Sequence, residues 1–121
     1  MGKKIIVIDD SLTVRQQVGL ALKQAGFDVI EAVDGQDGLR AIQSNQDASM
    51  AICDVNMPKM NGLEMLETLA QNGPKLPVLI LTTEGQPALI QRAKKSGAKG
   101  WIVKPFKADL LIATVKKLTA A

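Results

Sequence analysis

Four short apolar runs constrain the fold of this 121-residue chain more than any other feature of its sequence. The runs span residues 5–8, 50–53, 78–81 and 101–103, and segments with helical spacing of apolar residues lie between them. Runs of this length are typical of strands, and nearly continuous apolar strands are typical of a parallel sheet that is covered on both faces. The alternation of strands and helices therefore predicts an α/β fold with a doubly wound parallel sheet.

A fifth strand is predicted at residues 27–32, where the partial alternation of apolar and polar residues is expected of a strand nearer the edge of the sheet. The last strand is predicted to begin at Gly100. The first helix follows Ser11, whose hydroxyl can cap it, and ends at Gly26. Four further helices are marked by Leu39 and Ile42, by Leu63 to Ala70 with an end near Gly73-Pro74, by Pro87 to Ala93 with an end at Gly97, and by Leu111, Val115 and Leu118.

The composition argues against several classes of protein. The chain has no His, the commonest general base and transition-metal ligand, so neither a zinc site nor a Ser-His-Asp triad is expected. The single Cys, Cys53, precludes an internal disulfide, and its apolar neighbours indicate a buried small hydrophobic residue rather than a redox switch. No apolar stretch approaches the ~20 residues of a membrane span, so we expect a cytoplasmic protein with one domain over residues 1–121.

Each of the four apolar runs leads into a residue that can handle a phosphoryl group or a cation. These residues are Asp9-Asp10, Asp54, Thr82 and Lys104, in the order of the runs. Ligands of open parallel sheets bind outside the carboxyl ends of the strands, so the side chains are expected to converge on one crevice. A single Asp at a strand end is usually a turn former or a helix cap, but this set at the same ends of different strands favours a binding site.

Asp9, Asp10 and Asp54 would bring three carboxylates together, and these repel one another unless a cation intervenes. Mg²⁺ suits such a cluster, because it takes oxygen ligands and needs only one or two carboxylates beside water and phosphate. A carboxylate can also act as a nucleophile and form an aspartyl-phosphate, a reaction that needs little beyond positioning and neutralised charge. In this interpretation Lys104 supplies a fixed positive charge, and Thr82 supplies a hydroxyl donor for a phosphoryl oxygen.

In the order and spacing of these residues, the whole chain resembles the response-regulator receiver domains of two-component signalling. The resemblance rests on Asp9-Asp10, Asp54, Met57-Pro58, Asn61-Gly62, Thr82 and Lys104-Pro105-Phe106. It implies a flavodoxin-like fold of three α/β/α layers, with five helices around a five-stranded sheet of order 2-1-3-4-5. It also implies a single receiver domain over residues 1–121 with no output domain. Such a domain is a signalling switch rather than an enzyme, with intrinsic autophosphorylation and autodephosphorylation activity.

The resemblance assigns Asp54 as the residue that accepts a phosphoryl group from the phosphohistidine of a histidine kinase. Asp10 and Asp54 would bind Mg²⁺ directly, together with the backbone carbonyl of Asn56. Asp9 would act on the ion through water, and Lys104 would pair with the phosphoryl group.

Four residues are implied to control the switch and its lifetime. Thr82 would move toward the phosphoryl group, and Trp101, at a position where receivers usually carry Tyr or Phe, would turn inward with it. Asn56 and Glu84 resemble the positions that tune the lifetime of the phosphorylated state. The Lys104-Pro105 peptide bond is expected to be cis.

The net charge of +3 is unevenly distributed along the chain. Residues 92–121 hold eight basic residues and one acidic residue, whereas the rest hold seven basic and eleven acidic residues. The basic residues are either solvated side chains on surface helices or a site for an acidic partner, such as the kinase or a flagellar switch or other motility component. No segment is left over for a helix-turn-helix, so nucleic acid is not an expected partner, and without a long apolar stretch neither is a membrane. The lysines on or near the fourth helix, fifth strand and fifth helix, which we call the basic patch, are Lys94, Lys95, Lys99, Lys107, Lys116 and Lys117.

Two alternatives to a stand-alone chemotaxis regulator stay open. The first is a single-domain phosphorelay intermediate, although Asp10-Ser11 and the Thr-Thr-Glu stretch at residues 82–84 look more like chemotaxis regulators. The second is a phosphohydrolase with an aspartyl nucleophile, of the haloacid-dehalogenase type. That enzyme class would require an acid two residues beyond Asp10, where this chain has Leu12, and a cap domain for which no residues are left.

Overall fold

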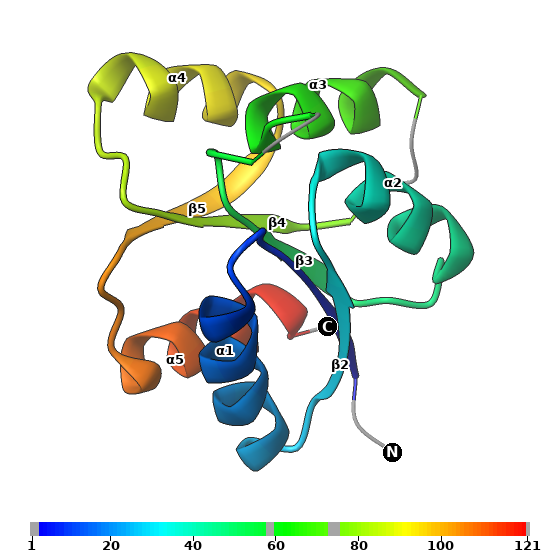
Figure 1. Ribbon diagram of the computed structural model, residues 1–121, viewed down its shortest axis with the longest axis vertical. Helices are drawn as coiled ribbons and strands as arrows, with labels where there is room; N and C mark the ends of the chain where they lie inside the picture. The colour runs from blue at the N-terminus through cyan, green and yellow to red at the C-terminus, as the bar shows by residue number, and fades with distance from the viewer. Residues whose placement is uncertain (1–2, 58–59, 73–75, 121) are drawn as a thin grey trace.

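The computed structural model describes residues 3–57, 60–72 and 76–120, and these residues form one sheet of five parallel strands (Figure 1). The strands lie in the order β2-β1-β3-β4-β5, so the expected order is confirmed. The partly exposed β2 lies at an edge, as its alternating sequence predicts. The strands are β1 (Lys4–Ile8), β2 (Asp28–Ala32), β3 (Met50–Cys53), β4 (Val78–Thr82) and β5 (Ala98–Val103).

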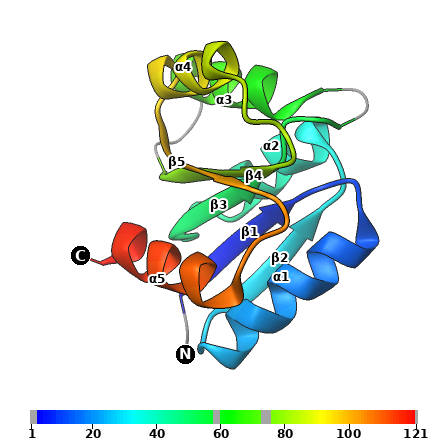
Figure 2. The same cartoon turned by 90° about the vertical axis from the view of Figure 1, so that its left-hand side faces the viewer.

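Five helices connect the strands and follow β5: α1 (Leu12–Gln24), α2 (Gly35–Ser44), α3 (Gly62–Asn72), α4 (Pro87–Lys95) and α5 (Ala108–Thr119). Figures 1 and 2 show α1 and α5 on one face of the sheet and α2, α3 and α4 on the other, which gives the three expected layers. None of the helices in the described part of the chain has the length and hydrophobicity that crossing a membrane requires.

The alternating side chains of the strands build two separate cores. In β1, Ile6 and Ile8 pack with α2 and α3, whereas Ile5 and Val7 pack with α1 and α5. Successive side chains of a strand point to opposite faces of the sheet, so a strand buried on both faces must be apolar at every position. This is why the central strands read as continuous apolar runs.

Helix boundaries follow the residues that predicted them. The Ser11 hydroxyl accepts a hydrogen bond from the Val14 amide (3.3 Å) and caps α1. Gly26 and Gly97, just past the ends of α1 and α4, have φ angles of 92° and 102°. Residues with a Cβ rarely adopt these angles, so glycine at these two positions ends each helix at little cost.

Two strand boundaries differ from the prediction. β2 starts at Asp28 rather than at Phe27, because the Phe27 amide donates to the Leu22 carbonyl (3.0 Å) at the end of α1. β5 starts earlier than predicted, at Ala98, and joins β4 across a shift in register. The predicted end of the third helix near Gly73-Pro74 lies outside the described residues.

The register of the sheet aligns the carboxyl ends of four strands. Ile8 pairs with Cys53 at the ends of β1 and β3, and β4 and β5 also end as a pair. The polar residues at these ends therefore leave the sheet along one edge: Asp9, Asp54 and Lys104, beside Thr82 at the end of β4.

Candidate metal centre

The backbone of Asp9 and Asp54 is fixed by the sheet that precedes it. The Asp9 amide donates to the Ala32 carbonyl (3.1 Å), and the Asp54 amide donates to the Ile8 carbonyl (3.0 Å). Both acidic residues are buried, with only 3% and 7% of their surface exposed, whereas Asp10 is exposed. The backbone from which each of the two buried carboxylates extends is therefore held in place by the sheet.

Asp9, Asp10 and Asp54 each bring a carboxylate oxygen to within 4.8 Å of the other two, so the three acids converge as predicted. The cluster offers oxygen ligands, which suit Mg²⁺ better than softer transition metals. Mg²⁺ binds through one or two carboxylates and keeps several waters. An exposed acid beside two buried ones fits this ion, because the exposed side of the cluster leaves room for water and phosphate.

The Lys104 ammonium bridges the two buried carboxylates, with Nζ 2.9 Å from Asp9 Oδ2 and 2.9 Å from Asp54 Oδ2. Burial disfavours the charge of Lys104, but these two hydrogen bonds outweigh it and raise the pKa of the ammonium. Burial raises the pKa of Asp9, against the hydrogen bonds that it accepts from Lys104 and from the Ser11 amide (2.9 Å). Lys104 alone therefore does not offset the burial of the Asp9 carboxylate, and a further cation would be stabilised here.

Asn56 and Glu84 join two loops beside the acids. The Asn56 amide donates to Asp54 Oδ1 (3.3 Å), and its side-chain Nδ2 donates to Glu84 Oε1 (2.9 Å). The loop after β3 is thereby tied to the loop after β4, next to the Asp54 carboxylate. Asn56 and Glu84, the two residues expected to tune the lifetime of the phosphorylated state, are therefore in direct contact. Their effect on that lifetime stays a prediction, as does the role of the Asn56 carbonyl as a metal ligand.

Glu84 also contacts both expected switch residues through its backbone. Its amide donates to Thr82 Oγ1 (3.3 Å), and its carbonyl accepts a hydrogen bond from Trp101 Nε1 (2.8 Å). Thr82 is fully buried, and Trp101 is half-buried. A Phe ring has no N–H or O–H donor, so the indole at this position makes a tie to the loop that Phe cannot make.

Gly62, the first residue of α3, lies directly against the backbone of Asp54. A Cβ atom on Gly62 would lie 2.0 Å from the Asp54 carbonyl oxygen, so a larger residue would push the loop after β3 away. The Gly62 amide also donates to the Val55 carbonyl (3.0 Å), which closes the loop. Pro58 of the Met57-Pro58 pair in this loop lies outside the described residues.

Two features next to the acids are as expected. Cys53 is buried in the core, its Sγ donates to the Asp54 carbonyl (3.1 Å), and burial raises the pKa of its thiol. A buried thiol that resists ionisation is a poor redox switch, which confirms the interpretation as a small hydrophobic residue. The Lys104-Pro105 peptide bond is cis.

Arg15 lies against the acids, although the sequence did not point to it. Its Nη1 donates to the Asp9 carbonyl (2.7 Å), and its Nε pairs with Glu31 Oε1 of β2 (3.0 Å). The available signal was one cation in the first turn of a helix that begins just after two acids. Such a residue is common on helix surfaces, so the signal is weak.

The lysines of the basic patch are all exposed, but they lie on both faces of the sheet. Lys94 and Lys99 line a small hollow between α4 and β5, together with Trp101. Lys116 instead lines a groove between α5 and α1. The part of the patch next to the expected switch residue is therefore Lys94 and Lys99.

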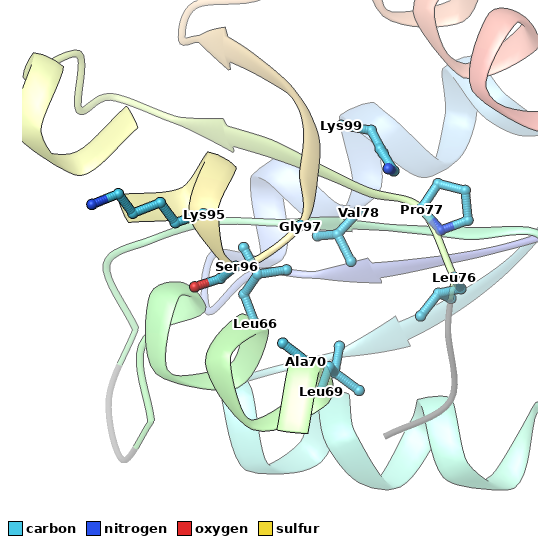
Figure 3. Close-up of a pocket in the computed structure, with 10 residues that line it drawn as sticks. All are labelled: Leu66, Leu69, Ala70, Leu76, Pro77, Val78, Lys95, Ser96, Gly97 and Lys99. Atoms are coloured by element: carbon cyan, nitrogen blue, oxygen red, sulfur yellow. The ribbon is translucent and has the colours of Figure 1, made fainter. Parts of the chain in front are cut away.

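An apolar recess of about 490 Å³ lies between α3 and the amino ends of β4 and β5 (Figure 3). Leu66 and Leu69 of α3 line it with Val78 of β4, and the Lys95 ammonium extends away from these side chains. None of the 10 residues that line it carries a carboxylate. The acids lie at the opposite ends of the strands, so this recess is not part of the candidate metal centre.

Known receiver domains match this chain over most of its length. The model of the response regulator receiver domain family matches residues 5–116. Chemotaxis protein CheY1 of Helicobacter pylori is 36% identical over 111 residues, which cover 89% of this chain and 90% of that protein. A probable chemotaxis protein CheY of Rhizobium etli is 37% identical over 121 residues, which cover 98% of this chain and 88% of that protein.

A solved structure agrees with the sequence relatives. Chemotaxis response regulator CheY4 of Vibrio cholerae has a TM-score of 0.88 at 37% sequence identity, and the match covers 98% of this chain and 99% of that one. The fold, the cluster of acids and the relatives lead to the same assignment. This chain belongs to the response regulator receiver domain family and is similar to its chemotaxis members of the CheY type.

Proposed function

We propose that this receiver domain accepts a phosphoryl group on Asp54 from the phosphohistidine of a histidine kinase. The observation that carries this proposal is the convergence of three carboxylates, whose nearest oxygens lie within 4.8 Å of one another, with the Lys104 ammonium 2.9 Å from two of them. Phosphoryl transfer depends mainly on positioning and on charge neutralisation, and this arrangement supports both. The domain acts as a signalling switch that is itself phosphorylated and dephosphorylated.

Transfer starts at the Asp54 carboxylate. One of its oxygens attacks the phosphorus in line with the phosphohistidine nitrogen, so a P–O bond forms as the P–N bond breaks and the imidazole takes up a proton. The Lys104 ammonium, already bonded to Asp54, stays close enough to pair with a phosphoryl oxygen. Bound Mg²⁺ would neutralise the charge of the phosphoryl oxygens. Asp10, Asp54 and the Asn56 carbonyl would hold the ion, with Asp9 acting through water.

The switch is proposed to follow from the contacts of Thr82. Its hydroxyl accepts a hydrogen bond from the Glu84 amide, and donation to a phosphoryl oxygen would draw Thr82 toward Asp54. The Glu84 carbonyl holds Trp101, so movement at Thr82 changes the surroundings of the indole ring. A difference of a few kcal/mol between two states is enough for phosphorylation to shift their populations. The surface formed by α4, β5 and α5 would then change for partners.

Trp101 is the single Trp of the chain and reports this switch without a label. We expect Mg²⁺ with beryllium fluoride, which mimics a phosphoryl group, to change the Trp101 fluorescence of the unmodified protein but not of Asp54→Asn. Asp28→Asn is the matched control, because Asp28 is exposed at the opposite end of the sheet. A response that survives Asp54→Asn would contradict the assignment of Asp54 as the acceptor.

We further propose that the downstream partner is a motility component, such as a part of the flagellar switch, and that the domain acts in the cytoplasm. Two relatives are named as chemotaxis proteins, which supports this assignment. The exposed Lys94 and Lys99 beside Trp101 suit an acidic surface on the kinase or the target. Neither nucleic acid nor a membrane is part of this proposal.

Electrostatic docking on Lys94 and Lys99 predicts binding that depends on salt. The screening length falls from about 10 Å at 0.1 M to about 3 Å at 1 M ionic strength, so affinity for the kinase should drop as salt is added. Lys94→Glu and Lys99→Glu should weaken binding, and Lys116→Glu, on the α1 side, should not. Salt-insensitive binding would count against this surface.

A further inference from the structure

Asp9 is held by a hydrogen bond at each of its polar groups. Its amide donates to the Ala32 carbonyl (3.1 Å), and its carboxylate accepts from the Ser11 amide and from Lys104, at 2.9 Å each. The remaining group, the backbone carbonyl, accepts from Arg15 Nη1 at 2.7 Å. The Arg15 guanidinium therefore holds the oxygen of the peptide unit between Asp9 and Asp10 by a hydrogen bond.

Arg15 is itself anchored on both sides. Its Nε pairs with Glu31 Oε1 of β2 at 3.0 Å, and its backbone amide donates to the Ser11 carbonyl (3.0 Å) in the first turn of α1. Only 11% of the Arg15 side chain is exposed, compared with 45% for Glu31. The guanidinium thus links α1, β2 and the segment that carries the acids.

We propose that Arg15 is a positioning residue that aims the Asp10 carboxylate at the cation site. The peptide unit is planar, so fixing its carbonyl oxygen also fixes the direction in which the chain continues to the Cα of Asp10. Asp10 is exposed and lacks the burial that holds Asp9 and Asp54. Its placement within 4.8 Å of the other acids then depends on this peptide unit. The role rests on the proposed Mg²⁺ site.

A competing explanation is that Arg15 serves only as a positive charge that offsets the acids. The two roles predict opposite effects on metal binding. A nearby cation repels Mg²⁺, so loss of a mere counter-charge would leave Mg²⁺ binding unchanged or make it tighter. Loss of a positioning group would weaken Mg²⁺ binding, because Asp10 would no longer be aimed at the site.

Arg15→Lys separates the two roles, since Lys keeps the charge but lacks the planar fork that reaches the Asp9 carbonyl and Glu31 together. Mg²⁺ affinity is measured by calorimetry on the full chain. Loss of groups that orient metal ligands costs about 10–100-fold in affinity, and we expect about tenfold for both Arg15→Lys and Arg15→Ala. Arg92→Lys is the matched control, because Arg92 binds Glu67 through Nε and Nη2, both at 2.8 Å, away from the acids.

Thermal unfolding of each metal-free variant establishes that the titrated protein is folded. Weaker Mg²⁺ binding in both Arg15 variants, with Arg92→Lys unchanged, supports the positioning role. Unchanged or tighter binding in folded Arg15→Lys overturns it. If the Arg15 variants do not fold, Glu31→Gln loosens the anchor of the guanidinium instead, and unchanged affinity in that variant overturns the proposal. An unmodified protein that does not bind Mg²⁺ would instead refute the proposed function.

Discussion

At the scale of single residues, Glu84 connects three parts of the site. Its carboxylate accepts from Asn56 (2.9 Å), while its backbone bonds to Thr82 and to Trp101. Truncation to Ala would remove the tie to Asn56 and leave the two backbone contacts in place. The side chain and the backbone of this residue can therefore be tested separately.

Asn56→Ala and Glu84→Ala should each accelerate loss of the phosphoryl group from Asp54. Either truncation removes the same side-chain hydrogen bond beside Asp54, and we expect this to give water freer access to the Asp54 carboxylate. The decay of the phosphorylated protein after the donor is removed measures this rate. Because the two residues share one contact, the double variant should decay more slowly than the two single effects multiplied together would predict. Unchanged decay in both single variants would remove these residues from the mechanism.

The sequence predicted the acids, Thr82 and Lys104 because each follows or ends an apolar run, and strand ends in a parallel sheet lie along one edge. It did not predict the contacts of Arg15 or the bond from Trp101 to Glu84. These contacts join residues of different elements, and their formation depends on how the helices and loops pack rather than on any local pattern. The sequence therefore predicted which residues carry the chemistry of the site, but not the hydrogen bonds that hold those residues in place.

At the scale of secondary-structure elements, an ion pair connects α4 to α3. The Arg92 guanidinium of α4 donates two hydrogen bonds of 2.8 Å to the Glu67 carboxylate of α3. Both side chains are partly exposed, so the pair adds little to stability in salt. The pair nevertheless links α3 to α4, which belongs to the proposed partner surface.

The Glu67–Arg92 pair predicts a small effect of acid on stability. The hydrogen bond from Arg92 lowers the pKa of Glu67 below its ordinary value of 4.5. A lowered pKa in the folded state means that the pair stabilises the fold above pH 4.5 and that this stabilisation is lost as the pH falls through the lowered value. Glu67→Gln should remove this part of the pH dependence in thermal unfolding at low salt. An identical pH dependence in Glu67→Gln would disprove the contribution of the pair.

The first residue of α3, Gly62, should not tolerate a side chain. Gly62→Ala places a Cβ against the Asp54 carbonyl oxygen, and overpacking of this kind typically costs about 1–3 kcal/mol in the free energy of unfolding. Gly85→Ala is the control, because its Cβ would meet the Val103 side chain at an ordinary 3.7 Å. Denaturant unfolding measures both variants, and equal stability of the two would contradict the close approach.

The central strands were predictable because burial on two faces demands a continuous apolar run. The start of β5 was not, because Ala98-Lys99-Gly100 forms no such run and pairs with β4 across a shift in register. The pairing partner, rather than the segment itself, makes these residues a strand. Local periodicity carries no information about such a partner.

At the scale of the whole molecule, the sheet separates features that are close in sequence. The basic patch reads as one group along the chain, yet α4 and α5 cover opposite faces (Figure 2). The strand order likewise depends on how the connections cross the sheet, and periodicity does not encode it; the family resemblance supplied it. The acids and the apolar recess of Figure 3 lie at opposite ends of the strands, so the two regions are chemically independent.

The central claim is that the acidic cluster makes Asp54 a phosphoryl acceptor, and direct phosphorylation tests it. The protein is incubated with a small acyl phosphate and Mg²⁺, and its intact mass and peptides are analysed. We predict addition of one phosphoryl group, located on Asp54, that depends on Mg²⁺ and is absent in Asp54→Asn. An unmodified protein that gains no phosphoryl group with Mg²⁺ present, or a modification that persists in Asp54→Asn, would contradict the account.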